Sequence, residues 1–143
     1  LGGAAAGGAA ALAAALSKWY FAEPRPKLYF EQQARAELVS HIEGVELAAS
    51  ATTSLPSGHT LAAAAIYLFL ALMLPPMRFL WLQMLLLLVV AAVAFSRLYL
   101  FQHFLLDVVA GGTIGTGIAL AAAWATQKCR IAGADTQKKM PQI

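Results

Sequence analysis

The sequence predicts an all-α fold in which four apolar helices form a bundle that is integral to a membrane. Hydrophobic residues make up 60% of the 143 residues and charged residues only 12%, whereas about a quarter of a typical soluble domain is charged. The apolar residues also gather in four long stretches with polar segments between them. The composition excludes a disordered chain or a collagen, and the single cysteine, Cys129, excludes an intramolecular disulfide.

The first two stretches differ in hydrophobic strength. Residues 1–17 are mainly alanine and glycine, so we expect a helix that packs closely against its neighbours, with Gly3 and Gly7 as small residues on one face. A flexible low-complexity tail is the alternative for this segment. The second stretch, residues 58–74, is continuously apolar after its first turn, and Pro75 ends it because proline interrupts a helix.

The third and fourth stretches are the strongest candidates for membrane spans. Residues 79–95 contain one strongly polar side chain, Gln83, and residues 104–126 are interrupted by Asp107 and a few small residues. The Gly111–Gly115 spacing predicts close packing against another helix. Seventeen helical residues cover about 26 Å, slightly less than the ~30 Å hydrocarbon core, so we expect tilting or local thinning of the bilayer.

A polar segment, residues 18–57, separates the first stretch from the second and contains all five glutamates. Leu38, Ile42 and Val45 recur at helical spacing within it, which favours an amphipathic helix on the membrane surface. A solvated loop with chance spacing is the alternative.

The alternation of spans divides the polar segments between two sides of the membrane. Residues 18–57 and 96–103 fall on one side, and residues 75–78 fall on the other with the end of the chain. Each side carries five Lys or Arg residues. Cytoplasmic segments of membrane proteins carry an excess of Lys and Arg. If several cations of the first side are held in a binding site, the other side has more free positive charges and is then the cytoplasmic one. We expect a transmembrane catalytic domain over residues 1–127 and a polar tail over 128–143.

Three clusters of polar residues fall on the first of these sides and form a candidate site. Their cations neutralise an anion, and guanidinium groups bind phosphoryl oxygens in a bidentate manner. A helix that begins at Ser57 and Gly58 adds free backbone N–H groups. The candidate residues are Lys18 and Arg25; Ser57, Gly58 and His59; and Arg97, His103 and Asp107.

The spacing of His103 and Asp107 places both on one face of a helix, where the carboxylate orients the imidazole. Neutral His103 can then attack phosphorus and form a phosphohistidine, while His59 protonates the leaving oxygen and later activates water. Taken singly, the histidines also fit a membrane interface and the cations fit membrane boundaries. Asp107 is harder to dismiss, because a carboxylate inside an apolar span is costly.

Other chemistries lack a sequence signal. The three histidines are far apart and no Cys/His cluster has metal-ligand spacing. The glycine-rich start lacks the Gly-Lys-Ser/Thr ending of a nucleotide loop. The net charge of +3 is too weak and dispersed for nucleic acid. We therefore expect no metal, no cofactor and no nucleic acid.

The three clusters match three motifs in order. They are Lys-x6-Arg-Pro at Lys18–Pro26, Pro-Ser-Gly-His at Pro56–His59, and Ser-Arg-x5-His-x3-Asp at Ser96–Asp107. With these motifs the chain resembles the type 2 phosphatidic acid phosphatase (PAP2) superfamily, which also includes vanadium haloperoxidases.

This resemblance implies a PAP2/haloperoxidase-like helical core and a metal-independent phosphatase. It implies that His103 is the nucleophile, Asp107 its orienting partner and His59 the general acid and base. It also assigns phosphate binding to Lys18, Arg25, Ser57, Gly58 and Arg97.

Bacterial membrane members of the family resemble the chain most. They imply a lipid phosphate substrate and a site on the outer face of the cytoplasmic membrane. Candidate substrates are phosphatidic acid, phosphatidylglycerol phosphate, undecaprenyl pyrophosphate and lipid A phosphates. These members usually have six membrane helices, so we expect two more before Leu1.

Two other functions fit parts of the pattern. A non-catalytic membrane protein that binds a lipid phosphate would need the cations but not both His59 and His103, which are present. A vanadate-dependent haloperoxidase would use the same pocket, but such members are largely soluble, and this chain is strongly apolar.

Overall fold

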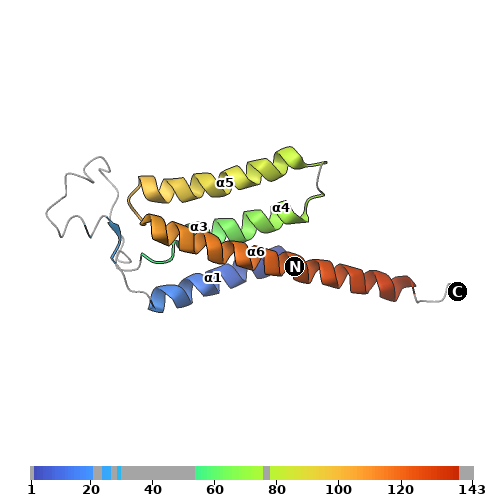
Figure 1. Ribbon diagram of the computed structural model, residues 1–143. Coiled ribbons are helices and arrows are strands. Elements are labelled where there is room, and N and C mark those ends of the chain that lie inside the picture. Colours follow the sequence, from blue (N-terminus) through green and yellow to red (C-terminus); the bar gives the residue numbers. More distant parts are fainter. Residues whose placement is uncertain (1, 21–23, 27–28, 30–53, 76–77, 139–143) are drawn as a thin grey trace.

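The part of the chain that is described in the computed structural model is helical (Figure 1). The described residues are 2–20, 24–26, 29, 54–75 and 78–138. The helices are α1 (Gly2–Tyr20), α3 (Gly58–Ala63), the π-helical turn η2 (Ala64–Leu68), α4 (Phe69–Met73), α5 (Leu80–Tyr99) and α6 (Leu105–Lys138). The predicted all-α class is confirmed for these residues. The amphipathic helix predicted around Leu38–Val45 lies outside them.

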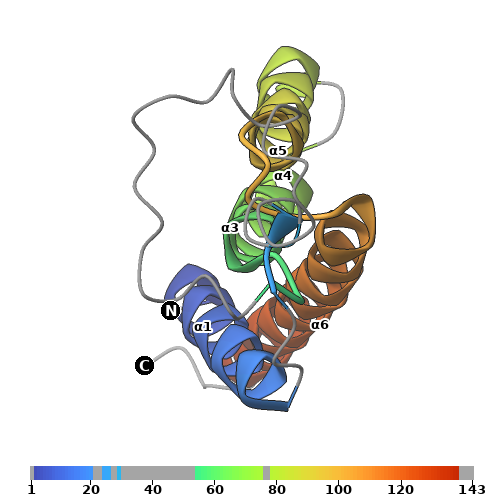
Figure 2. The same cartoon turned by 90° about the vertical axis from the view of Figure 1, so that its left-hand side faces the viewer.

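The helices alternate in direction, as the sequence predicted. α3, η2 and α4 form one continuous rod, and α6 packs along this rod and along α1. Seen nearly along the helices, α5 lies on the opposite side of the rod from α1 (Figure 2). α1 and α5 end, and α3 and α6 begin, at the left-hand end of Figure 1. This arrangement brings the three polar clusters to one end of the bundle.

Two glycines let α6 approach α3 closely. A Cβ on Gly111 would lie 2.5 Å from the carbonyl oxygen of Ser57. A Cβ on Gly115 would collide with the carbonyl oxygen of Leu61 and lie 2.8 Å from the Cβ of Ala64. The prediction of close packing at Gly111–Gly115 is therefore confirmed, and this contact fixes the start of α3 against the start of α6.

α1 is a packed helix and not a flexible tail. Gly3 and Gly7 face Phe69 and Ile66, where an added Cβ would make contacts of 3.6 and 3.9 Å. The tighter approach is at Gly2, where a Cβ would lie 2.7 Å from the Phe69 ring. The small residues of α1 thus serve close packing, although the tightest contact falls on a glycine that the predicted pair did not include.

Two of the described helices are long and apolar enough to cross a membrane: α5 and residues Leu105–Gly133 of α6. The rod Gly58–Met73 is apolar but shorter. α1 consists largely of alanine and glycine, which are only weakly hydrophobic. Of the four predicted spans, two therefore have the length and hydropathy of a span on their own.

Large apolar side chains cover the outside of these helices. α5 has no buried residue. Exposed examples are Trp81, Leu88 and Phe95 on α5 and Leu106 and Trp124 on α6. Water contact with such a surface is unfavourable, whereas lipid contact is not. The surface is therefore consistent with a membrane environment.

α6 continues beyond the predicted end of its span. The sequence predicts a polar tail over residues 128–143, whereas α6 is 34 residues long and ends at Lys138. The side chains of Gln127, Lys128 and Arg130 are exposed. Glutamine, lysine and arginine are good helix formers, so a polar sequence can extend a helix that the apolar residues have already nucleated.

Gln83, the one strongly polar residue of the third stretch, has a structural role. Its Nε2 donates hydrogen bonds to the carbonyl oxygens of Ala71 (3.0 Å) and Leu74 (3.3 Å). The last carbonyls of a helix lack intrahelical donors, so Gln83 of α5 satisfies the end of α4 and holds the two helices together.

Candidate functional site

The side chain of Asp107 caps the start of α6. Asp107 is the third residue of the helix, and its Oδ2 accepts a hydrogen bond from the backbone N–H of Phe104 at 2.8 Å. This is one half of a capping box, in which the third residue caps the residue before the helix. The same Oδ2 accepts a hydrogen bond from the Ser54 hydroxyl. Asp107 is 2% exposed, so these donors compensate for the burial of its carboxylate.

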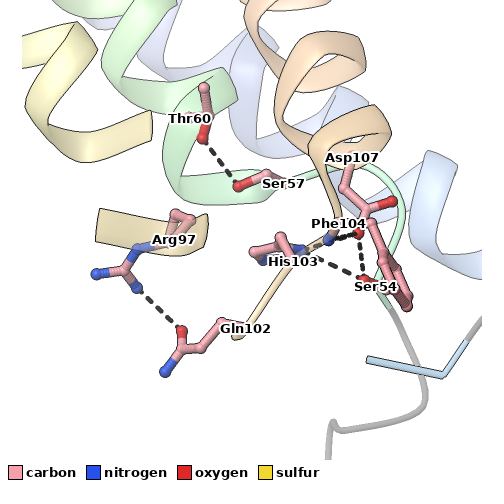
Figure 3. A network of polar contacts seen from close by, with 8 residues as sticks. All are labelled: Ser54, Ser57, Thr60, Arg97, Gln102, His103, Phe104 and Asp107. Carbon is pink, nitrogen blue, oxygen red and sulfur yellow. Dashed lines mark hydrogen bonds and ion pairs between the residues drawn. The ribbon is translucent and has the colours of Figure 1, made fainter. Parts of the chain in front are cut away.

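His103 lies in the turn before α6 and not on the helix itself. The predicted shared helix face is therefore wrong in its geometry, because α6 begins at Leu105. The pairing still forms: Nδ1 of His103 lies 3.5 Å from Oδ2 of Asp107 (Figure 3). Ser54 Oγ is also 3.5 Å from Nδ1. His103 is 4% exposed, and its ring is held by this buried network.

The Ser57–His59 cluster forms the start of α3. The Ser57 N–H donates to the backbone carbonyl of Asp107 at 2.9 Å, and Ser57 Oγ is 2.9 Å from Thr60 Oγ1. The first intrahelical bond runs from Leu61 N–H to the Ser57 carbonyl. The N–H groups of the first turn after Ser57 have no intrahelical acceptor, whereas the Ser57 N–H is already bonded to Asp107.

Three cations come from three different segments. Lys18 is in the last turn of α1, and its Nζ lies 3.9 Å from the position that a Cβ would take on Gly58. Arg97 is in the last turn of α5, and its Nη1 donates to Gln102 Oε1 at 3.1 Å. Burial and the nearby charge of Arg97 lower the pKa of Arg25. The cations therefore gather despite their mutual repulsion, as expected for an anion site.

The imidazole of His103 is kept neutral by its surroundings. Burial lowers the pKa of His103 to about 4, and the positive charges of Arg25 and Lys18 act in the same direction. The Asp107 carboxylate raises this pKa but does not outweigh the burial. His103 is therefore unprotonated at neutral pH, the state in which a ring nitrogen has a lone pair for attack.

The more exposed His59 lies within the field of the same cations. The charges of Arg97, Lys18 and Arg25 all act on its ring. All of the candidate residues are thus linked by contacts or by electrostatic interactions, and the structure places them together at one end of the bundle: Lys18, Arg25, Ser57, Gly58, His59, Arg97, His103 and Asp107.

Sequence reasoning missed three residues of this network: Ser54, Thr60 and Gln102. Each binds a predicted residue through a neutral hydroxyl or amide. Such groups are common in any polar loop, so no spacing rule singles them out. Their roles become visible only once the contacts are known.

The donor set of the site suits an anion. Among the residues that the structure describes, no three His, Cys, Asp or Glu side chains gather in the way that a metal ion requires. The site instead combines two guanidinium groups, one ammonium group and two imidazoles around a helix start. Such groups bind phosphoryl oxygens.

Comparison with known proteins gives a family. The family model of the PAP2 superfamily matches residues 2–131, a range that contains every candidate residue. No curated protein and no solved structure matches the chain. Since the match covers most of the 143 residues, the chain belongs to the PAP2 superfamily.

Proposed function

We propose that this protein is a membrane phosphatase that hydrolyses a lipid phosphate monoester or pyrophosphate through a phosphohistidine, without a metal ion. Membership of the PAP2 superfamily indicates a phosphatase-type activity. The observation that carries the finer proposal is the buried, neutral His103, which is paired with Asp107 and lies within the field of Lys18 and Arg25.

The cations bind and orient the phosphate. Arg25 and Arg97 offer guanidinium forks, and Lys18 adds a point charge beside Gly58. The N–H groups of the first turn of the α3–η2–α4 rod contribute further donors. These groups are fixed before the substrate arrives, so they stabilise the charge of the transition state without reorganisation.

The reaction proceeds in two steps. Nε2 of His103 donates its lone pair to phosphorus, the P–O bond to the leaving group breaks, and His59 gives the leaving oxygen a proton. His59 then takes a proton from water, the water oxygen attacks phosphorus, the P–N bond breaks, and inorganic phosphate leaves. Asp107 faces Nδ1 throughout and stabilises the charge that develops on the ring.

The position of the site supports a lipid substrate. The site lies where α5 ends and α6 begins, and these are the two helices long enough to span a bilayer. Exposed aromatic side chains occur at the same end, namely Trp19, Tyr20 and Tyr99. Aromatic residues of this kind mark the membrane–water interface, at the depth of lipid headgroups. Our proposal places this end at the outer face of a bacterial cytoplasmic membrane.

The test is phosphate release from micellar phosphatidic acid in excess EDTA. We expect the unaltered protein to release phosphate and His103→Ala to be slower by at least about 100-fold, because the nucleophile is lost. Cys129→Ser serves as the matched control, since Cys129 is exposed and remote from the site. Full activity of His103→Ala, or activity that EDTA abolishes, would contradict the proposal.

A further inference from the structure

The Ser54 hydroxyl is a buried polar group that the proposed mechanism does not yet use. Ser54 is completely buried. Its Oγ donates to Oδ2 of Asp107 and lies 3.5 Å from Nδ1 of His103 (Figure 3). It therefore contacts both members of the catalytic pair, although it precedes His103 by 49 residues in the sequence.

We propose that Ser54 is a positioning residue that connects His103 to Asp107. Its hydroxyl oxygen accepts a hydrogen bond from Nδ1–H, and its O–H donates a hydrogen bond to the carboxylate. This chain keeps the proton on Nδ1 and leaves the lone pair on Nε2, where phosphorus is attacked. The inference rests on the proposed function only for its effect on the rate.

The acceptor positions of Asp107 Oδ2 are already occupied, whereas those of the Ser54 hydroxyl are not. Oδ2 of Asp107 accepts the Phe104 N–H at 2.8 Å and the Ser54 hydroxyl. These two bonds fill the two acceptor positions of one carboxylate oxygen. Nδ1 of His103 lies 3.5 Å from that oxygen and also 3.5 Å from Ser54 Oγ. Both distances are longer than a normal N–H···O bond, so free lone pairs and not distance distinguish the two acceptors. The Ser54 oxygen, in contrast, still has lone pairs with which to accept the Nδ1 proton.

The burial of the network makes the hydroxyl important. His103 and Asp107 are 4% and 2% exposed, so there is little access for water to replace Ser54. Without the hydroxyl, the buried ring loses this side-chain acceptor and keeps the backbone hydrogen bond with Ser54 and the long contact with Asp107. The ring can then turn or change its tautomer, which places a proton on Nε2 and blocks the attack.

The consequence is specific to the chemical step. The proposed phosphate-binding groups are Lys18, Arg25 and Arg97, whereas the Ser54 hydroxyl contacts His103 and Asp107. Loss of the hydroxyl should therefore lower kcat and leave KM nearly unchanged. A hydrogen bond to a charged group, here the Asp107 carboxylate, accounts for a factor of about 10 to 100.

The experiment compares Ser54→Ala and Ser54→Thr with Thr116→Ala in the detergent-solubilised full chain. Thr116 is the matched control, because its half-buried hydroxyl bonds only its own helix, at Gly112 O. We expect a fall in kcat of about 10- to 100-fold for Ser54→Ala with KM within about twofold. Threonine retains the hydroxyl and should restore most of kcat. Thr116→Ala should match the unaltered protein.

A second measurement does not depend on turnover. In protein labelled with ¹⁵N-histidine, with the His103 signal assigned by its absence from His103→Ala, the nitrogen shifts report the tautomer. We expect Nδ1–H in the unaltered protein and a mixture in Ser54→Ala. If Ser54→Ala does not fold, Ser54→Cys, which has a weaker donor of similar size, should show the same change.

The two readouts separate the two proposals. An unchanged tautomer in Ser54→Ala, or in Ser54→Cys where the alanine variant is unfolded, would overturn the role of Ser54 whether or not the protein turns over. An unchanged kcat in a folded variant would overturn it as well. Absence of turnover in the unaltered protein would count against the proposed function alone, while a changed tautomer would still support the role of Ser54.

Discussion

Burial lowers the pKa of His103 to about 4 from an ordinary value of 6.5, and this shift determines how the rate depends on acid. In the proposed mechanism, protonation removes the lone pair that attacks phosphorus, so the acid limb of the kcat/KM profile should lie near pH 4 and not near 6.5. On the alkaline side His59 loses the proton that the leaving oxygen needs. We therefore expect a bell-shaped profile with an unusually acidic lower limb.

The measurement is kcat/KM between about pH 3 and about pH 9. A short-chain, water-soluble phosphate ester is the suitable substrate, because lipid entry then does not limit the rate. A lower limb at 6.5, the ordinary value for histidine, would show that burial does not control His103. A flat profile would contradict the assignment of the two histidines as base and acid.

The residues of the site divide into those that the sequence could reveal and those that it could not. Charged groups are costly near an apolar span, so Arg97 and Asp107 stood out against their neighbours. The hydroxyl of Ser54 carries no such cost in a polar loop, and its function depends on burial that only tertiary packing creates. The Arg97–Gln102 bond was equally invisible, since an amide has many possible partners.

At the scale of helices, the contact between α3 and α6 depends on glycine. Gly115→Ala places a methyl group against the Leu61 carbonyl oxygen and 2.8 Å from the Ala64 Cβ. Such overpacking costs about 1–3 kcal/mol, and we expect a lower Tm in detergent. The matched control is Gly117→Ala, because a Cβ there has nothing within 4 Å. It should keep or raise Tm, since alanine favours a helix.

Thermal unfolding followed by circular dichroism measures both variants. A shift of α6 away from α3 would also disturb the Ser57–Asp107 backbone bond, so Gly115→Ala should lose activity below its Tm. Equal effects of the two substitutions would mean that the close approach of α3 and α6 does not matter for stability.

The helices themselves were predictable to different degrees. The apolar runs at residues 58–74 and 79–95 predicted the rod and α5 to within a few residues, because proline and polar residues bound them. The π-helical turn Ala64–Leu68 was not predictable, since alanine and leucine also form ordinary helix. His103 lies outside α6 because Asp107 caps the helix at Phe104, so that the helix begins at Leu105. The i, i+4 spacing alone does not show this contact.

At the scale of the whole molecule, the orientation in the membrane can be tested with the natural sequence. Cys129 is the only cysteine and is exposed on α6, away from the site and just after the apolar stretch 104–126 that the sequence predicts to cross the membrane. If the site faces outward, a membrane-impermeant maleimide should label Cys129 in inverted vesicles and not in intact spheroplasts. Labelling of spheroplasts would reverse the orientation. Cys129→Ser is the control for background labelling.

The length of α6 has a mechanical consequence. Its 34 residues extend about 51 Å, whereas the hydrocarbon core is ~30 Å thick. The helix is therefore longer than the hydrocarbon core is thick, and its first residue, Leu105, follows the turn that contains His103. Nζ of Lys128 lies 4.4 Å from the centre of the Trp124 ring. Such a pair anchors a helix at the membrane–water interface, here the interface on the side away from the site. In a thicker or thinner bilayer, the start of α6 should then lie at a different depth relative to the lipid headgroups of the other leaflet. His103 would change its depth with it.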